Sequence, residues 1–267
     1  MISSVIKGLL RLTAVLAVFA AASGAVLWLY IDRVAASALT RGIGRAGDVA
    51  CEVRRVGVSL VNGTIEIDAL AVKNPAGYPP AAMFDVGGAH ATLASGTLWS
   101  RPIHVKELRL VRPAIRLEAG VGGSNIKVYL ENVARNLRKP DGTEDAPTRL
   151  IVDRLVLSDG VVRVGSGFST MKLMDIEVAS AELTDIRGRD GAGATIGELT
   201  AMVVLEMLRR GAATGDINLH ALVPPQLMAG LRAVLDSTSI IFQGVTDIWK
   251  SPMKTFLRSL TRPTTQP

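Results

Sequence analysis

Apolar residues recur at one spacing three times in this chain, and that spacing constrains the fold more than any other feature. Each copy has two apolar residues two positions apart, a step of five positions, and two more apolar residues two positions apart. Such alternation is typical of a β-strand that buries one face. The residues of the pattern are Val58, Leu60, Ile65 and Ile67 in the first copy, Leu108, Leu110, Ile115 and Leu117 in the second, and Leu155, Leu157, Val162 and Val164 in the third.

The residues in the middle of each copy predict a turn. Asn62-Gly63 and Asp159-Gly160 suit a two-residue hairpin turn of type I′, which needs positive φ at both central positions. Around such a turn Leu60 pairs with Ile65, so the four apolar side chains of a copy lie on one face. Arg112-Pro113 occupies this place in the second copy. Because proline excludes a type I′ turn, the chain there bends from one strand into the next by another route.

We therefore expect three strand pairs that are apolar on one face and polar on the other. The other expected elements are strands over 84–93 and 172–183, a helix over 124–138, a polar loop over 139–147, helices over 196–208 and 224–249, and a short last helix that begins at Ser251-Pro252. The expected fold class is α+β. An N-terminal transmembrane helix precedes a curved, mostly antiparallel β-sheet of repeated hairpins, which carries an inserted helix and is followed by C-terminal amphipathic helices.

The N-terminal part of the chain predicts a membrane anchor. Residues 12–31 contain no charged side chain, and a helix of about 20 residues crosses the roughly 30 Å hydrocarbon core of a bilayer. Trp28 and Tyr30 lie at the distal end of the run, where aromatic rings favour the headgroup region. Lys7 and Arg11 precede it and favour a cytoplasmic N-terminus, although basic residues also follow the run.

The small residues at 20–24 would also suit cleavage by a signal peptidase, and both interpretations export the rest of the chain. Cys51 is the only cysteine, which fits a bacterial envelope protein without disulfides. We expect a single-pass protein of the bacterial inner membrane with most of its mass in the periplasm. The expected divisions are a cytoplasmic N-terminus (1–11), the transmembrane helix (12–31), a stalk (32–50), a β-rich domain (51–190), a helical C-terminal region (191–262) and a disordered tail (263–267).

The sequence predicts no catalytic residues, no metal site and no cofactor, so we do not expect an enzyme. His90, His104 and His220 are isolated, and none has the spacing of a metal-ligand pair. The glycine-rich residues 191–197 lack the Gly-Lys-Ser/Thr ending of a phosphate-binding loop. A net charge of +6 permits attraction to anionic lipid. Because the basic residues are dispersed and aromatic residues make up 4% of the chain, nucleic acid is not an expected partner.

A basic amphipathic segment lies near the C-terminus. The membrane-surface candidates in it are Lys250, Lys254, Phe256, Leu257 and Arg258. Cations on one side and apolar side chains on the other suit a helix that lies on an anionic membrane surface. The alternative is a terminal helix that packs on the sheet.

The anchored β-rich region resembles the AsmA-like family of bacterial envelope proteins. The resemblance covers roughly residues 1–185, and it is carried by the N-terminal anchor, by residues 56–86, with Asn74-Pro75 closing a strand, and by the later pair 105–118 and 152–164. It implies a curved sheet whose concave apolar face holds lipid acyl chains, and a role in outer-membrane assembly or phospholipid transport. The apolar residues of the repeat are then lipid-facing candidates, and membrane lipid and envelope proteins are the expected partners.

The alternative is a structural or scaffolding envelope protein that binds no lipid. In that case the C-terminal helices cover the apolar face and complete an ordinary core. The sequence does not set the oligomeric state.

Overall fold

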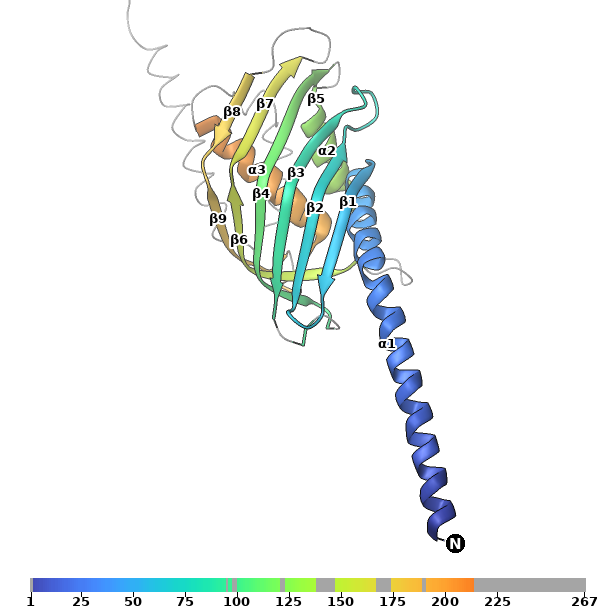
Figure 1. Cartoon of the computed structure of the whole chain (residues 1–267). Coiled ribbons are helices and arrows are strands. Elements are labelled where there is room, and N and C mark those ends of the chain that lie inside the picture. Colours follow the sequence, from blue (N-terminus) through green and yellow to red (C-terminus); the bar gives the residue numbers. More distant parts are fainter. Residues whose placement is uncertain are drawn as a thin grey trace, which may run out of the picture.

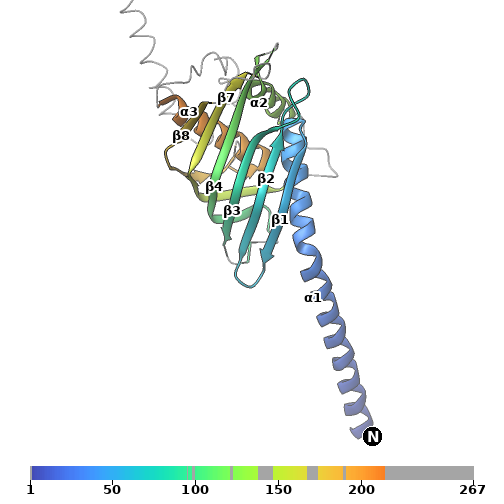
Figure 2. The same cartoon turned by 45° about the horizontal axis from the view of Figure 1, so that its top comes forward.

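The computed structural model describes residues 2–94, 96–97, 100–120, 123–137, 147–166, 174–188 and 191–213. Over these residues the fold is α+β, as predicted, with a curved, mixed and mostly antiparallel sheet (Figure 1). Figures 1 and 2 show α2 and α3 on one face of the sheet and the upper part of α1 along its β1 edge.

Ten strands form one sheet within the described residues. They are β1 (Cys51–Ser59), β2 (Thr64–Lys73), β3 (Ala82–Leu93), β4 (Ile103–Gly120), β5 (Gly123–Ser124), β6 (Arg149–Ser158), β7 (Gly160–Ser166), β8 (Met174–Val178), β9 (Ala181–Ile186) and β10 (Ala194–Thr195). Strands β1 to β4 pair antiparallel in chain order, and β4 then pairs in parallel with both β6 and β7. Antiparallel partners complete the other side, β9 on β6 and β8 on β7.

The first copy of the repeat forms a hairpin, as predicted, but with a different turn. Val58 pairs with Ile65, so residues 60–63 form the loop and the predicted pairing of Leu60 with Ile65 is wrong. Gly63 has a φ of +62°, whereas a type I′ turn needs positive φ at both central residues. The register differs from the predicted one by two positions, so each strand residue keeps the face that was expected.

The second and third copies are not hairpins, which corrects the prediction. β4 continues through Arg112-Pro113 as one strand, and β6 and β7 follow one another along its side. Leu108 lies beside Leu155, and Ile115 beside Val162. Equivalent residues of the second and third copies are therefore direct neighbours in a parallel strand pairing.

Residues with positive φ interrupt β2, β4 and the junction of β6 and β7, and together they form a crease across the sheet. Ala69, Arg112 and Asp159 have φ values of +49°, +51° and +56°, a region that non-glycine residues seldom occupy. By register, Gly87 lies between Ala69 and Arg112, and Asp159 lies opposite Arg112. A Cβ atom on Gly87 would be 3.0 Å from Nε of Arg112. Glycine thus leaves room for the Arg112 side chain to cross the crease.

The crease also shifts the alternation between the two faces by one residue. In β4 the inward positions run from Leu110 to Pro113 and on to Ile115, a step of three followed by a step of two. The same step of three separates Ile67 from Leu70 in β2. In the second copy this single extra residue produces the five-position step from Leu110 to Ile115, which resembles a hairpin in the sequence.

Helix α1 (Ile2–Gly47) runs without a break from the N-terminal run into the folded body. The C-terminal part of the helix contacts β1, α2 and α3, and Ile43 is buried there, so the segment predicted as a stalk over 32–50 packs in part against the folded body. The helix ends with Asp48 at a φ of +52° and a hydrogen bond of 3.1 Å from Val49 N–H to the carbonyl of Gly44, a Schellman termination.

Helix α2 (Asn125–Asn136) and helix α3 (Ile196–Ala213) cover the inner face and correspond to the helices predicted over 124–138 and 196–208. Ser124 caps α2 by accepting a hydrogen bond from Lys127 N–H. Thr195 and Glu198 form a reciprocal capping box at the start of α3. β10 therefore occupies part of the segment that was expected to be helical from residue 191.

The predicted transmembrane helix over 12–31 falls within α1. Among the described residues, none of the helices combines the length and the apolar character that a membrane crossing requires. The predicted helix over 224–249, the segment from Ser251, and the tail over 263–267 lie outside the described residues.

Candidate functional site

Cross-strand pairing brings the lipid-facing candidates together in rows on the inner face. One row contains Val58, Ile65, Ala91, Leu108, Leu155 and Leu183. The next contains Val56, Ile67, Ala89, Leu110, Leu157 and Ala181. Beyond the crease, Ile115 and Val162 are neighbours, as are Leu117 and Val164. Residues directly opposite each other share a face of a sheet, so the candidates form one apolar surface.

The cover over this surface is uneven. Six candidates are buried, namely Leu110, Ile115, Leu117, Leu155, Leu157 and Val162. Five are half-buried, namely Val58, Ile65, Ile67, Leu108 and Val164. Helix α3 contacts β7 and β8, and α2 contacts β4. Within the two rows the half-buried candidates lie in β1, β2 and β4, although Val56 of β1 is buried, and the buried candidates lie in β4 and β6.

Leu60 is the one candidate that lies outside the sheet. It begins the β1–β2 loop of residues 60–63, where its side chain is 37% exposed and that of Val61 is 97% exposed. Two neighbouring apolar residues at a hairpin tip contribute little to the core. Val61 was not among the candidates, because its position in the predicted strand pattern gave it no special role.

The described side chains of the N-terminal part of α1 are also apolar and uncovered. Val18 and Phe19 are 69% and 72% exposed, and Leu12, Val15 and Leu16 are exposed in the same way. An apolar surface of this extent is unusual on a protein surface that faces water, and it is typical of an interaction site. Near the end of the uncharged run, the Arg33 guanidinium lies 5.5 Å from the Tyr30 ring centroid.

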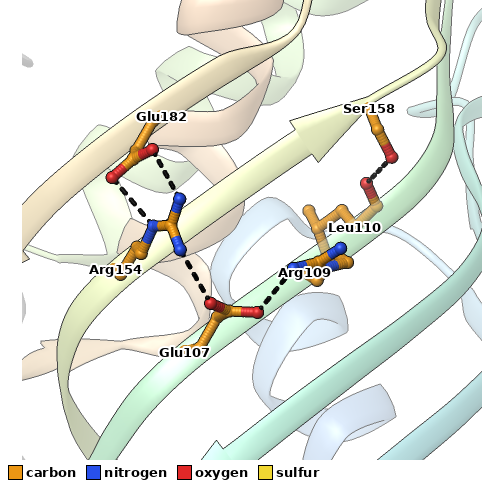
Figure 3. A network of polar contacts seen from close by, with 6 residues as sticks. All are labelled: Glu107, Arg109, Leu110, Arg154, Ser158 and Glu182. Carbon is orange, nitrogen blue, oxygen red and sulfur yellow. Dashed lines mark hydrogen bonds and ion pairs between the residues drawn. The ribbon is translucent and has the colours of Figure 1, made fainter.

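The outer face of the sheet is polar and carries ion pairs between strands (Figure 3). Arg154 makes two hydrogen bonds to Glu182, of 2.8 and 2.9 Å, and a third of 3.1 Å to Glu107. Arg109 donates to the other Glu107 oxygen at 2.9 Å. Hydrogen bonds from Arg154 lower the pKa of Glu182. Because these groups are exposed, water and salt screen the pairs, and the network makes this face strongly hydrophilic.

A buried polar cluster joins β2, β4 and α2 beyond the crease. Asn125 donates to Oδ1 of Asn74 at 2.7 Å and accepts a hydrogen bond from Glu118 N–H at 2.9 Å. Asn74 in turn donates to the Glu118 carboxylate at 3.0 Å. Glu118 did not stand out in the sequence, because its partners lie far away along the chain. The mutual hydrogen bonds indicate that the cluster positions the start of α2 on the sheet.

His104 and Cys51 are two reactive side chains in the described part of the chain. His104 lies 2.7 Å from Oδ1 of Asp153, and both side chains are exposed, as is common for surface pairs. Burial raises the pKa of Cys51 to about 11, so its thiol stays protonated and weakly nucleophilic at neutral pH. Among the described residues, no three His, Cys, Asp or Glu side chains lie together in a way that could hold a metal ion.

The membrane-surface candidates Lys250, Lys254, Phe256, Leu257 and Arg258 lie outside the described residues. No protein-family model matches the sequence, and comparisons with curated proteins and with solved structures find no significant match.

Proposed function

We propose that this chain is a membrane-anchored protein of the bacterial envelope that contacts lipid through the β1–β2 end of its apolar sheet face. The observation that carries the proposal is the exposed apolar surface of α1, at residues such as Val18 and Phe19, on a helix that continues into the folded body. The uncharged sequence over residues 12–31 supports insertion of this part in a bilayer.

Lipid contact on the sheet is confined in this proposal to the less covered part. Val58, Ile65 and Ile67 of β1 and β2 are half-buried, and so is Leu108 of β4, which shares a row with Val58 and Ile65. An acyl chain placed against them would remove apolar surface from water, which favours binding by about 25 cal/mol per Å². The proposal agrees with the AsmA-like resemblance and a role in outer-membrane assembly or phospholipid transport, with no catalytic step.

A photocrosslinking experiment tests lipid contact. A benzophenone amino acid at Ile65 faces the apolar side, and the same group at the exposed Glu66 faces the opposite side. After irradiation of cells, mass spectrometry of the purified full chain should find phospholipid adducts at position 65 and few at position 66. Equal adduct levels at both positions would contradict a lipid site on the apolar face.

A second candidate function is an envelope scaffold without ligand. It is favoured by the complete burial of Leu155 and Leu157 on the same face. In this case the label at position 65 should form adducts mainly with residues of this chain or of another protein. The masses of the adducts therefore distinguish the two functions.

The location of the protein is tested separately. We propose the inner membrane, with the N-terminus in the cytoplasm and the sheet in the periplasm. A C-terminal alkaline phosphatase fusion should be active, because that enzyme matures only outside the cytoplasm, and the chain should stay in the membrane fraction after carbonate washing. An inactive fusion would indicate the opposite orientation. Release of the chain by carbonate would contradict the proposed membrane anchor.

A further inference from the structure

The β1–β2 loop has a fixed position relative to α1. Oδ1 of Asp32 accepts a hydrogen bond of 2.8 Å from Val58 N–H, which joins the end of β1 to the helix. β1 runs toward the N-terminal end of α1, as Figures 1 and 2 show. The contact therefore fixes the height of the loop along the helix axis.

That height coincides with the end of the uncharged run. Val61 follows Val58 by three positions, and a strand advances about 3.3 Å per residue. The loop tip can therefore lie up to roughly 10 Å beyond Val58, a distance that α1 covers in six or seven residues at about 1.5 Å each. From Asp32 this distance reaches back into residues 12–31, so an extended loop reaches the level of the last turns of the proposed anchor.

The residues at this level are of the kind that favour a membrane interface. Tyr30 is 53% exposed and stacks against Arg33, an aromatic and cationic pair suited to the headgroup region. Next to the loop, Leu93 N–H donates to the carbonyl of Gly63 at 2.8 Å. That bond holds the end of β3 at the same level, where the following connection carries the exposed Arg101.

We propose that the loop of residues 60–63 is a second membrane contact, in which Leu60 and Val61 enter the boundary between headgroups and acyl chains. The inference rests on the proposed anchor in α1. The partner is the lipid bilayer that holds that anchor, because Asp32 places the loop beside the point where the helix leaves it. Two contacts fix the sheet relative to the bilayer and direct the β1–β2 end of its apolar face toward the lipid.

Fluorescence quenching in vesicles tests the loop contact with the full chain. Cys51 is replaced by alanine, and single cysteines are introduced by Val61→Cys, Phe19→Cys and Ala76→Cys for labelling with an environment-sensitive dye. Ala76 is an exposed residue in the β2–β3 connection at the other end of the sheet and is the matched control. Each labelled protein is reconstituted in phosphatidylethanolamine and phosphatidylglycerol vesicles that carry nitroxide lipids, with the nitroxide either shallow or deep in the acyl chain.

The label at position 61 should show blue-shifted emission and lose most intensity with the shallow nitroxide. The label at position 19 should lose most with the deep nitroxide, and the label at position 76 should be quenched by neither. If positions 61 and 76 behave alike while position 19 is quenched, the loop contact is wrong and the anchor stands. If position 19 is not quenched, the anchor is wrong, and the loop proposal fails with it.

Discussion

The two ends of the apolar sheet face have the same sequence pattern but different surroundings. Leu155 and Ile65 belong to one cross-strand row, yet Leu155 is fully buried and Ile65 is half-buried. The helices are distributed unevenly over the sheet: α3 contacts β7, β8 and β10, the last of which pairs with β6, and α2 contacts β4, whereas α1 packs along the β1 edge (Figure 1). Alternation therefore identifies the face of a strand, and the covering helices decide whether that face is core or contact surface.

The largest effect is expected from truncating the covered end. Leu155→Ala leaves a cavity in a fully buried site and should lower the free energy of unfolding by about 2–5 kcal/mol. Ile65→Ala should cost clearly less, because its site is partly open. Urea unfolding of the full chain in detergent measures both, and equal losses would show that the two ends are covered alike.

A smaller loss is expected from separating α3 from α1. A Cβ atom on Gly197 would overlap Cβ of Ala46, so Gly197→Ala should force the helices apart and cost about 1–3 kcal/mol. Gly57→Ala in β1 is the control, because nothing lies within 4 Å of the added atom. Thermal unfolding should separate the two variants, and a neutral Gly197→Ala would mean that the cover tolerates displacement.

The next effect concerns the ion pairs at the C-terminal end of α3 and depends on pH. Burial raises the pKa of Glu206, but hydrogen bonds from Arg209 and Arg210 outweigh it and hold the pKa below its ordinary value. A carboxyl with a depressed folded-state pKa stabilises the fold above its unfolded pKa, and this stabilisation disappears as the pH falls through the folded-state pKa.

Glu206→Gln should therefore cost roughly 1–2 kcal/mol at neutral pH and nothing at a pH where the wild-type carboxyl is protonated. Unfolding measured across the acidic range provides the comparison. A pH-independent difference between Glu206→Gln and the wild type would contradict an ionic role for this buried carboxylate.

The smallest effect is expected on the outer face. Arg154→Ala removes the hydrogen bonds to Glu107 and Glu182, but exposed ion pairs are screened and contribute little. Unfolding at low and high salt should show little change in the variant relative to the wild type. A large, salt-insensitive loss would show that this network supports the sheet as strongly as the covered core.

The sequence identified the faces of the strands better than their connections. Leu110 and Ile115 were correctly assigned to one face, but the step between them was interpreted as a turn. A turn and an extra residue within a continuous strand give the same spacing, and only the neighbouring strand distinguishes them. Arg112-Pro113 was the one local sign, because proline excludes the type I′ turn that was predicted for the first and third copies.

The candidate site was predictable to a similar degree. The helix over 124–138 was recognised from its own apolar stripe, and α2 confirms it. Which strands α2 and α3 cover depends on contacts between distant segments, such as the hydrogen bond from Asn132 to the carbonyl of Gly47. The uneven cover, and with it the exposed Val61, could therefore not be derived from the spacing alone.

The crease has a consequence for how the strands find their partners. In a sheet with uniform alternation, sliding one strand by two residues preserves its apolar face, so side-chain polarity opposes such an error only weakly. Here that slide would move Arg112 away from Gly87, which leaves room for its side chain, and away from Asp159, which also has a positive φ. The matched positions along the crease therefore select one register for the strand pairing, which side-chain polarity alone would not do.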